Sequence, residues 1–142
     1  MTYRSLMPVQ RFMLTAPNNG KKDYIKECES NKDWIDMMAV KGKPTLVQAG
    51  ASWCGPCVML KPLLLEEINS RNGAVNYFYV DVDKNAQIAQ MLQISSIPVV
   101  YMVRDGDLID EFVGVPKDTK KAIAAFVNKG LAASDASKEE KK

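Results

Sequence analysis

The sequence contains no histidine among its 142 residues, and this absence removes several kinds of chemistry. Ser-His-Asp and Cys-His nucleophile systems both need histidine, which is also the commonest metal ligand. The side chain that most often moves protons near neutral pH is missing as well. Any reaction catalysed by this chain's own side chains must therefore use thiols, carboxylates, lysines or tyrosines.

Long apolar runs and a strong net charge are also missing. No apolar stretch approaches the roughly 20 residues that a membrane-spanning helix needs, so we expect no membrane span. The formal net charge is only +2, which gives no sign of a nucleic-acid partner or a membrane surface. Only three cysteines occur, an odd number in a chain long enough to fold without cross-links, which argues against a secreted disulfide scaffold.

The two ends of the chain differ in composition from its centre. Residues 1–22 are basic, lack any acidic residue and carry scattered apolar side chains, which is typical of a mitochondrial targeting segment. We therefore expect the mitochondrial matrix, with a basic N-terminal arm and a cytoplasmic location as the alternative. Residues 133–142 are small and charged and predict a disordered tail. Residues 23–132 are expected to form one domain.

Strand-like and helix-like patterns alternate within the central segment. Short runs rich in β-branched and aromatic residues predict strands, and apolar residues at helical spacing predict helices. The order β-α-β-α-β-α-β-β-α predicts an α/β fold with a mixed, mostly parallel central sheet and helices on both faces. The predicted strands are 24–28, 45–50, 75–82, 97–103 and 108–113, and the predicted helices are 30–40, 54–70, 85–92 and 118–131.

Two cysteines stand three positions apart in the stretch Trp53-Cys54-Gly55-Pro56-Cys57, between a predicted strand and a predicted helix. Unpaired N–H groups and the helix dipole favour negative charge at a helix start, so the thiol pKa of Cys54 should be lowered. Cys57 lies one turn further on the same side, where it can attack a mixed disulfide formed at Cys54. Pro56 suits a first helical turn, Gly55 leaves the sulfur uncrowded, and Trp53 offers an exposed apolar platform.

Two other interpretations of this cysteine pair are weaker. A structural zinc site needs about four ligands, which one Cys-x-x-Cys pair and the remaining Cys28 cannot easily supply. A permanent structural disulfide would gain little from closing so short a loop. We therefore predict no metal and no bound cofactor, with the cysteine pair itself as the redox-active group. Cys28 is interpreted as a small buried hydrophobe, with a regulatory thiol as the alternative.

The Trp-Cys-Gly-Pro-Cys stretch after a strand, with Pro62 in the next helix and Ile97-Pro98 at a later strand, resembles the thioredoxin family. The resemblance implies the thioredoxin fold over roughly 24–131. It implies that Cys54 is the attacking thiol and Cys57 the resolving thiol of a protein-disulfide reductase.

The resemblance also implies how substrates dock and which partners take part. Pro98 is expected to be a cis-proline beside the cysteines, and the backbone of Ile97 to pair with an extended substrate segment. Gly114 is expected to let the substrate approach, so that Trp53, Ile97 and Gly114 form a docking rim. Implied partners are protein disulfides, among them peroxiredoxins and reductases of ribonucleotides or methionine sulfoxide. A flavoenzyme of the thioredoxin-reductase type would recycle the protein with NADPH.

The sequence departs from the family pattern beneath the motif. The family usually has a buried aspartate six residues before the first cysteine, which helps take the proton from the resolving thiol; this chain has Gln48 there. The lysine that commonly pairs with that aspartate corresponds to Tyr79, so the resemblance implies that Gln48 and Tyr79 form a neutral pair in place of the family's charged pair. Because glutamine cannot titrate, we expect weaker proton removal from Cys57 and faster reduction above neutral pH in Gln48→Asp. Small residues at 49–52 replace the usual aromatic ones and predict looser packing.

Two classes of function remain open from the sequence. The first is a thiol-disulfide oxidoreductase that reduces protein disulfides through a mixed disulfide. The alternative is a thioredoxin-fold accessory subunit of a larger assembly, a mitochondrial one if residues 1–22 are a targeting segment. Its cysteines would be vestigial or redox-sensing, and a stable complex would form through the N-terminal arm. Gln48 and the basic arm favour this alternative.

Overall fold

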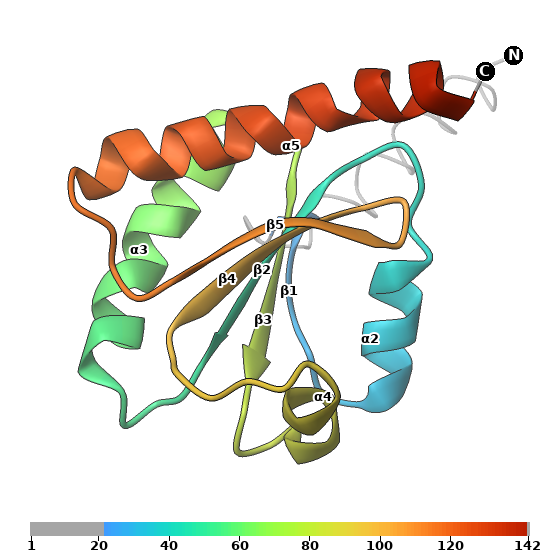
Figure 1. The fold of residues 1–142 in the computed structure, drawn as a ribbon. Helices are drawn as coiled ribbons and strands as arrows, with labels where there is room; N and C mark the ends of the chain where they lie inside the picture. Colours follow the sequence, from blue (N-terminus) through green and yellow to red (C-terminus); the bar gives the residue numbers. More distant parts are fainter. Residues whose placement is uncertain (1–21, 142) are drawn as a thin grey trace, which may run out of the picture.

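The structure is a computed structural model that describes residues 22–141. The predicted basic segment 1–22 therefore lies, apart from its last residue, outside the described residues. The elements follow the predicted order (Figure 1). Within the described part the strands are β1 (Ile25–Glu27), β2 (Thr45–Gly50), β3 (Asn76–Asp81), β4 (Val99–Arg104) and β5 (Asp107–Val113), and the helices are α2 (Asn31–Met38), α3 (Gly55–Ser70), α4 (Ala86–Met91) and α5 (Thr119–Lys141).

The five strands form one mixed sheet in the order β1-β3-β2-β4-β5. β3 pairs in parallel with β1 and β2, whereas β4 pairs antiparallel with β2 and β5. The prediction of a mixed sheet is confirmed, but the pairings are divided equally between the two kinds. The Asp105-Gly106 turn joins β4 to β5 with both residues at positive φ, 53° and 82°, as expected for a tight hairpin turn with Asp-Gly at its tip.

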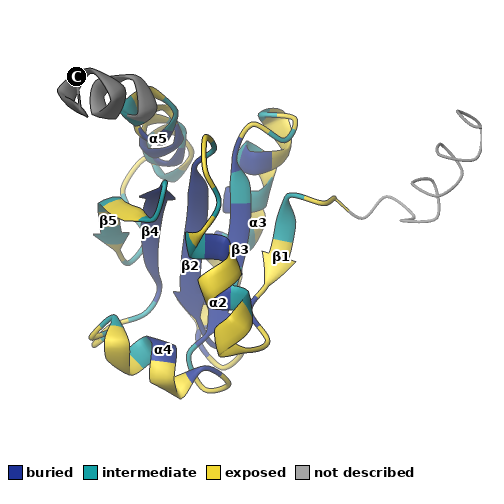
Figure 2. Cartoon of the chain, turned by 90° about the vertical axis from the view of Figure 1, so that its right-hand side faces the viewer, coloured by how far each residue is buried: buried dark blue, intermediate teal, exposed yellow. Residues whose placement is uncertain are grey.

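Helices cover both faces of the sheet, and the alternation of side chains along each strand divides the core into two clusters. β2 and β4 are buried along their whole length, and Figure 2 shows the central strands enclosed between exposed helix surfaces. The cluster under α3 and α5 includes Leu46, Leu60, Leu64, Ile68, Tyr77, Val100, Met102 and Ile123. The cluster under α2 and α4 includes Cys28, Trp34, Met37, Val47, Phe78, Val80, Ile88 and Tyr101.

The last helix is longer than the sequence predicts. Its expected last inward residue was Leu131, but α5 continues to Lys141. The backbone of the segment predicted as a disordered tail is therefore helical as far as Lys141. Helix α3, by contrast, ends at Ser70 as predicted, with Pro62 inside it.

Candidate active site at the start of α3

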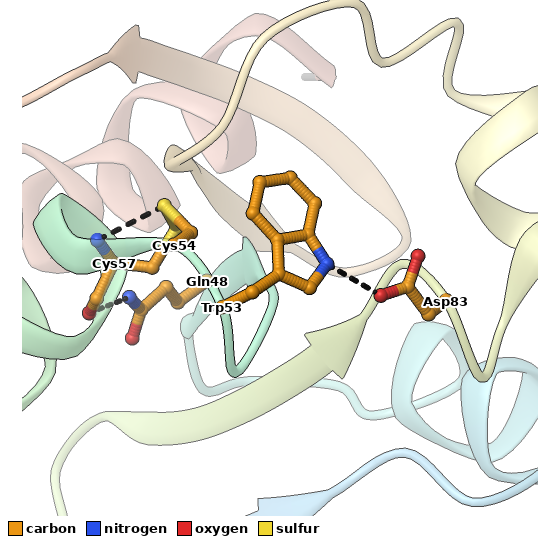
Figure 3. Close-up of a disulfide and its surroundings, with 5 residues drawn as sticks. All are labelled: Gln48, Trp53, Cys54, Cys57 and Asp83. Carbon is orange, nitrogen blue, oxygen red and sulfur yellow. Dashed lines mark hydrogen bonds between the residues drawn. A yellow bond between two sulfur atoms is a disulfide. The ribbon is translucent and has the colours of Figure 1, made fainter.

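The two cysteines of the motif lie at the first turn of α3, directly after β2. Cys54 is the N-cap residue: its backbone is extended, and its Sγ accepts a hydrogen bond from the N–H of Cys57 at 3.2 Å. Gly55 and Pro56 form the exposed start of the helix. The sulfurs of Cys54 and Cys57 are joined in a disulfide, with Cα atoms 5.3 Å apart (Figure 3). The first sulfur thus sits where helix N–H groups converge, which favours a thiolate after reduction.

Trp53 lies on the surface beside the disulfide, with 69% of its area exposed. Its indole points away from the sulfurs, and Nε1 donates to the carboxylate of Asp83 at 2.7 Å (Figure 3). The predicted exposure of Trp53 is confirmed. The hydrogen bond to Asp83 was not predicted, and it fixes the ring as a flat apolar surface next to the active-site loop.

The peptide bond between Ile97 and Pro98 is cis, and the predicted docking residues lie close to the cysteines. Ile97 packs against a small buried cluster that contains Cys54 and Cys57. The backbone N–H of Gly114 donates to the carbonyl of Pro98 at 2.7 Å. Gly114 has a φ of +82°, and no atom lies within 4 Å of the position that a Cβ would take. The loops carrying Ile97 and Gly114 therefore meet beside the disulfide and leave open space there.

Gln48 lies under the cysteine turn and is fully buried. Its Nε2 donates to the carbonyl of Cys57 at 3.1 Å (Figure 3), and its Oε1 accepts from the hydroxyl of Tyr77 at 2.5 Å. The prediction that Tyr79 would be the neutral partner of Gln48 is therefore wrong. Tyr79 is opposite Gln48 in the parallel ladder, but the long side chain of Tyr77 reaches the amide from two residues away.

Gly50, at the end of β2, allows Cys57 to pack directly on the sheet. A Cβ at Gly50 would lie 3.0 Å from the Cβ and 3.1 Å from the Sγ of Cys57, and 3.2 Å from the hydroxyl of Tyr79. The expectation of looser packing at residues 49–52 is wrong at this point, because a Cβ at Gly50 would lie closer to Cys57 than most real Cβ contacts do. A glycine inside a buried strand pattern is the sequence signal for such a close approach.

A cavity of about 390 Å³ opens next to Cys57 on this side of the sheet. Its walls combine Cys57 and several apolar side chains with charged and hydroxyl groups, including those of Glu27, Lys61, Tyr79, Asp81 and Lys84. Asp81 is buried, and its Oδ1 accepts from the backbone N–H groups of Asp83 and Lys84 at 2.9 and 3.3 Å. Asp81 was not among the predicted site residues, because its register beside Gly50 cannot be read from the sequence.

Cys28 lies on the other face of the sheet, away from the disulfide. It is 1% exposed, and its Sγ is 3.3 Å from the carbonyl of Ser30 and 3.4 Å from Oδ1 of Asn85. Burial, the largest influence, raises the pKa of the Cys28 thiol, although its hydrogen bond with Ser30 acts in the opposite direction. Cys28 therefore stays protonated and packed near neutral pH.

Within residues 22–141, no three side chains of the metal-binding types (Cys, Asp, Glu) gather closely enough to hold a metal ion. In the same part of the chain, no helix is long and apolar enough to cross a membrane.

The family model described as thioredoxin matches residues 25–129. A mitochondrial thioredoxin of Mus musculus is 31% identical over 101 residues, which cover 71% of this chain and 60% of the relative. A thioredoxin H-type of Chlamydomonas reinhardtii is 37% identical over 101 residues, covering 68% of this chain and 88% of the relative. This chain thus matches only about 60% of the length of its mitochondrial relatives.

Solved structures agree with this assignment. The thioredoxin of Malassezia sympodialis superposes with a TM-score of 0.60 at 29% identity, covering 71% of this chain and 88% of that one. The matched family uses a cysteine pair as its redox group and no bound cofactor. The motif, the cis-proline beside it, the sheet order and the matched residues agree, and the chain belongs to the thioredoxin family.

Proposed function

We propose that this protein reduces disulfides of other proteins through the dithiol of Cys54 and Cys57. The observation that carries the proposal is the position of the Cys54 sulfur as the N-cap of α3, bonded to the sulfur of Cys57. A thiolate at a helix N-terminus is stabilised by backbone amides and is a good nucleophile near neutral pH.

The reaction proceeds by two exchanges between sulfur atoms. The Cys54 thiolate attacks one sulfur of the client disulfide, a mixed disulfide forms, and the first client sulfur leaves as a thiolate. Cys57 then loses its proton and attacks the Cys54 sulfur, which releases the second client sulfur and forms the Cys54–Cys57 disulfide. Two electrons pass to the client, and a reductase must return two electrons to the protein.

The surface beside the disulfide supports a docking role for Trp53, Ile97 and Gly114. The exposed indole offers apolar area, and the open space at Gly114 lets a backbone come close. An extended client segment that pairs with the backbone of Ile97 would carry its disulfide to Cys54. A flavoenzyme of the thioredoxin-reductase type is the proposed electron donor.

We propose the mitochondrial matrix as the location. Support comes from the basic, acid-free residues 1–22 and from relatives of mouse, rat and cattle that are named mitochondrial thioredoxins. The cytoplasm is the alternative, because the Chlamydomonas relative carries no such name. Fusion of the full chain to a fluorescent protein, with and without residues 1–22, tests this. Mitochondrial signal that persists without that segment would contradict its targeting role.

Reduction of insulin by NADPH and a thioredoxin reductase tests the proposed activity. Cys54→Ser should lower the rate to that of the reaction without protein, because the attacking thiolate is lost. Cys57→Ser should accumulate a mixed disulfide, and the matched control Cys28→Ser should keep the wild-type rate. Full activity in Cys54→Ser would overturn the proposal.

The second candidate, an accessory subunit with vestigial or sensing cysteines, is favoured by Gln48, which stands where the family has a titrating residue, and by the basic residues 1–22. This candidate predicts co-purification with other proteins at fixed stoichiometry and no insulin reduction. A monomeric protein that is active with the reductase would exclude it.

A further inference from the structure

The proposed reaction requires Cys57 to lose a proton inside the protein, and Gln48 cannot accept it. Both ends of the Gln48 amide are already engaged, with the carbonyl of Cys57 and the hydroxyl of Tyr77. Cys57 is only 2% exposed, so bulk water has little direct access to its sulfur. Another acceptor must therefore lie close to this thiol for resolution to be fast.

Asp81 is placed to be that acceptor. Asp81 is the ladder partner of Gly50, and Gly50 is the residue against which the Cys57 sulfur packs. Neighbouring strands lie about 4.8 Å apart, so the Asp81 backbone is one strand spacing from that contact. Side chains alternate along β3, which directs Asp81 to the same face of the sheet as Tyr77 and Tyr79.

The cavity connects the two groups. Cys57 and Asp81 both line its wall, which mixes apolar side chains with charged and hydroxyl groups, and its volume of about 390 Å³ has room for several water molecules near those groups. The carboxylate is held in place by the N–H groups of Asp83 and Lys84. A fixed carboxylate and a thiol that line one small cavity can exchange a proton through water.

The other polar groups of the cavity are poorer acceptors. Burial of the hydroxyl, with smaller contributions from the charges of Asp81 and Glu27, raises the pKa of Tyr79, so Tyr79 keeps its proton at neutral pH. Lys61, whose Nζ lies 4.4 Å from the centre of the Tyr79 ring, and Lys84 are cations and have no lone pair to offer. Glu27 also lines the cavity but is exposed on the edge strand β1, whereas Asp81 is buried and is the ladder partner of Gly50, on which Cys57 packs.

We propose that the carboxylate of Asp81 accepts, through water in this cavity, the proton that Cys57 loses when it resolves the mixed disulfide. This inference rests on the proposed function. The Cys57 S–H bond breaks and its proton passes to Asp81, the new thiolate forms the Cys54–Cys57 bond, and the bond from Cys54 to the client sulfur breaks. The client sulfur leaves as a thiolate with its electron pair, and Asp81 returns its proton to solvent through the open cavity.

The resolving step can be measured without a client protein. Reduced Cys28→Ser protein is mixed with one equivalent of dithiobis-nitrobenzoate, which releases one coloured thiolate when Cys54 attacks and a second when Cys57 resolves the mixed disulfide. Asp81→Asn should slow the second release about tenfold or more at pH 7 and leave the first unchanged, since water-mediated transfer gives less than the roughly 100-fold of a direct base. The amide oxygen of Asn can still accept from the loop N–H groups, so the variant should fold.

The pH profile separates proton transfer from a structural effect. In the Cys28→Ser protein that retains Asp81, the second release should change little between pH 6 and 8, whereas in Asp81→Asn it should rise about tenfold per pH unit, following the free thiolate of Cys57. Glu27→Gln is the matched control and should behave like its parent. An unchanged second release in Asp81→Asn, or the loss appearing in Glu27→Gln instead, would overturn the proposal.

Two further outcomes have fixed meanings. If Asp81→Asn does not fold, the pH profile of the second release in the Cys28→Ser protein decides. A rise of about tenfold per pH unit in that protein would contradict the proposal, and a flat profile would support it. If the second release behaves as expected but insulin is not reduced, the proposed function fails and the role of Asp81 stands.

Discussion

Cys28 and Cys57 are two buried thiol positions on opposite faces of one sheet, with 1% and 2% of their surface exposed. Cys28 belongs to the apolar cluster under α2, and its polar neighbours are a carbonyl and an amide oxygen. Cys57 packs on Gly50, borders a cavity that Asp81 also lines and lies within bonding distance of a second sulfur at a helix start. The two thiols are therefore almost equally buried, but the groups around them differ.

The difference shows that burial alone does not decide what a thiol can do. The oxygens beside the Cys28 sulfur can accept a hydrogen bond from the protonated thiol, and burial raises the pKa of that thiol, so the unreactive form is favoured. Cys57, by contrast, has the Cys54 sulfur as its partner and shares a small cavity with Asp81, the proposed proton acceptor. Reactivity in this fold depends on which polar groups the sheet register places around a buried sulfur.

Alkylation of the reduced protein gives the largest expected contrast between the two faces. At neutral pH, iodoacetamide should modify Cys54 at least about a thousandfold faster than Cys28, because Cys28 must first be exposed by a local opening that costs several kcal/mol. Because its pKa is raised, Cys28 should gain reactivity only at alkaline pH. Peptide mass spectrometry after timed quenching measures both rates. Comparable rates at neutral pH would show that burial does not protect Cys28.

Adding a methyl group at Gly50, next to Cys57, should have the next largest effect, and the quantity affected is the stability of the fold. Gly50→Ala would place its Cβ 3.0 Å from the Cβ of Cys57, so we expect a loss of about 1–3 kcal/mol in the free energy of unfolding. Gly55→Ala is the matched control: nothing lies within 4 Å of its Cβ, and the change should stay below about 1 kcal/mol. Urea unfolding of both oxidised variants tests this. Equal stabilities would mean that Cys57 can move off Gly50 at no cost.

Local patterns were enough to predict the elements, but not the partners across strands. The bounds of β2, Thr45–Gly50, are those predicted, because an apolar run was enclosed between Pro44 and the cysteine motif. The Ser30 cap also followed from sequence, with its hydroxyl accepting from the N–H of Asp33 at 3.2 Å. These features depend on residues close together in the chain.

The missed features all depend on register. Residue types and spacing could not show that Tyr77 reaches Gln48, or that Asp81 lies beside Gly50. Asn85 is another case: it stands at the N-cap of α4, but its amide donates to the carbonyls of Cys28 and Asp81 instead of capping the helix with its oxygen. A one-residue slip of β3 would move Tyr77 and Asp81 to the other face of the sheet.

The smallest expected effect is that of a substitution at Gln48, where this chain departs from the family pattern. Gln48→Asp should speed the second thiolate release a few-fold above neutral pH, by placing a carboxylate directly under Cys57. The gain should be small because, on our proposal, Asp81 already serves this thiol. Gln48→Asn is the matched neutral control and should give no gain, and stopped-flow measurement of the second release compares the two.

The same substitution should weaken the fold in a pH-dependent way. Gln48 is fully buried, so an aspartate at this position should have a folded-state pKa above its unfolded value. Its protonated form is then the tolerated one, and stability relative to Gln48→Asn should fall as pH rises through that folded pKa. In the Asp81→Asn background the rate gain should become larger, since the new carboxylate would then be the main acceptor. A gain of the same size in both backgrounds would mean that the two carboxylates do not serve the same proton, and Asp81 would lose its proposed role.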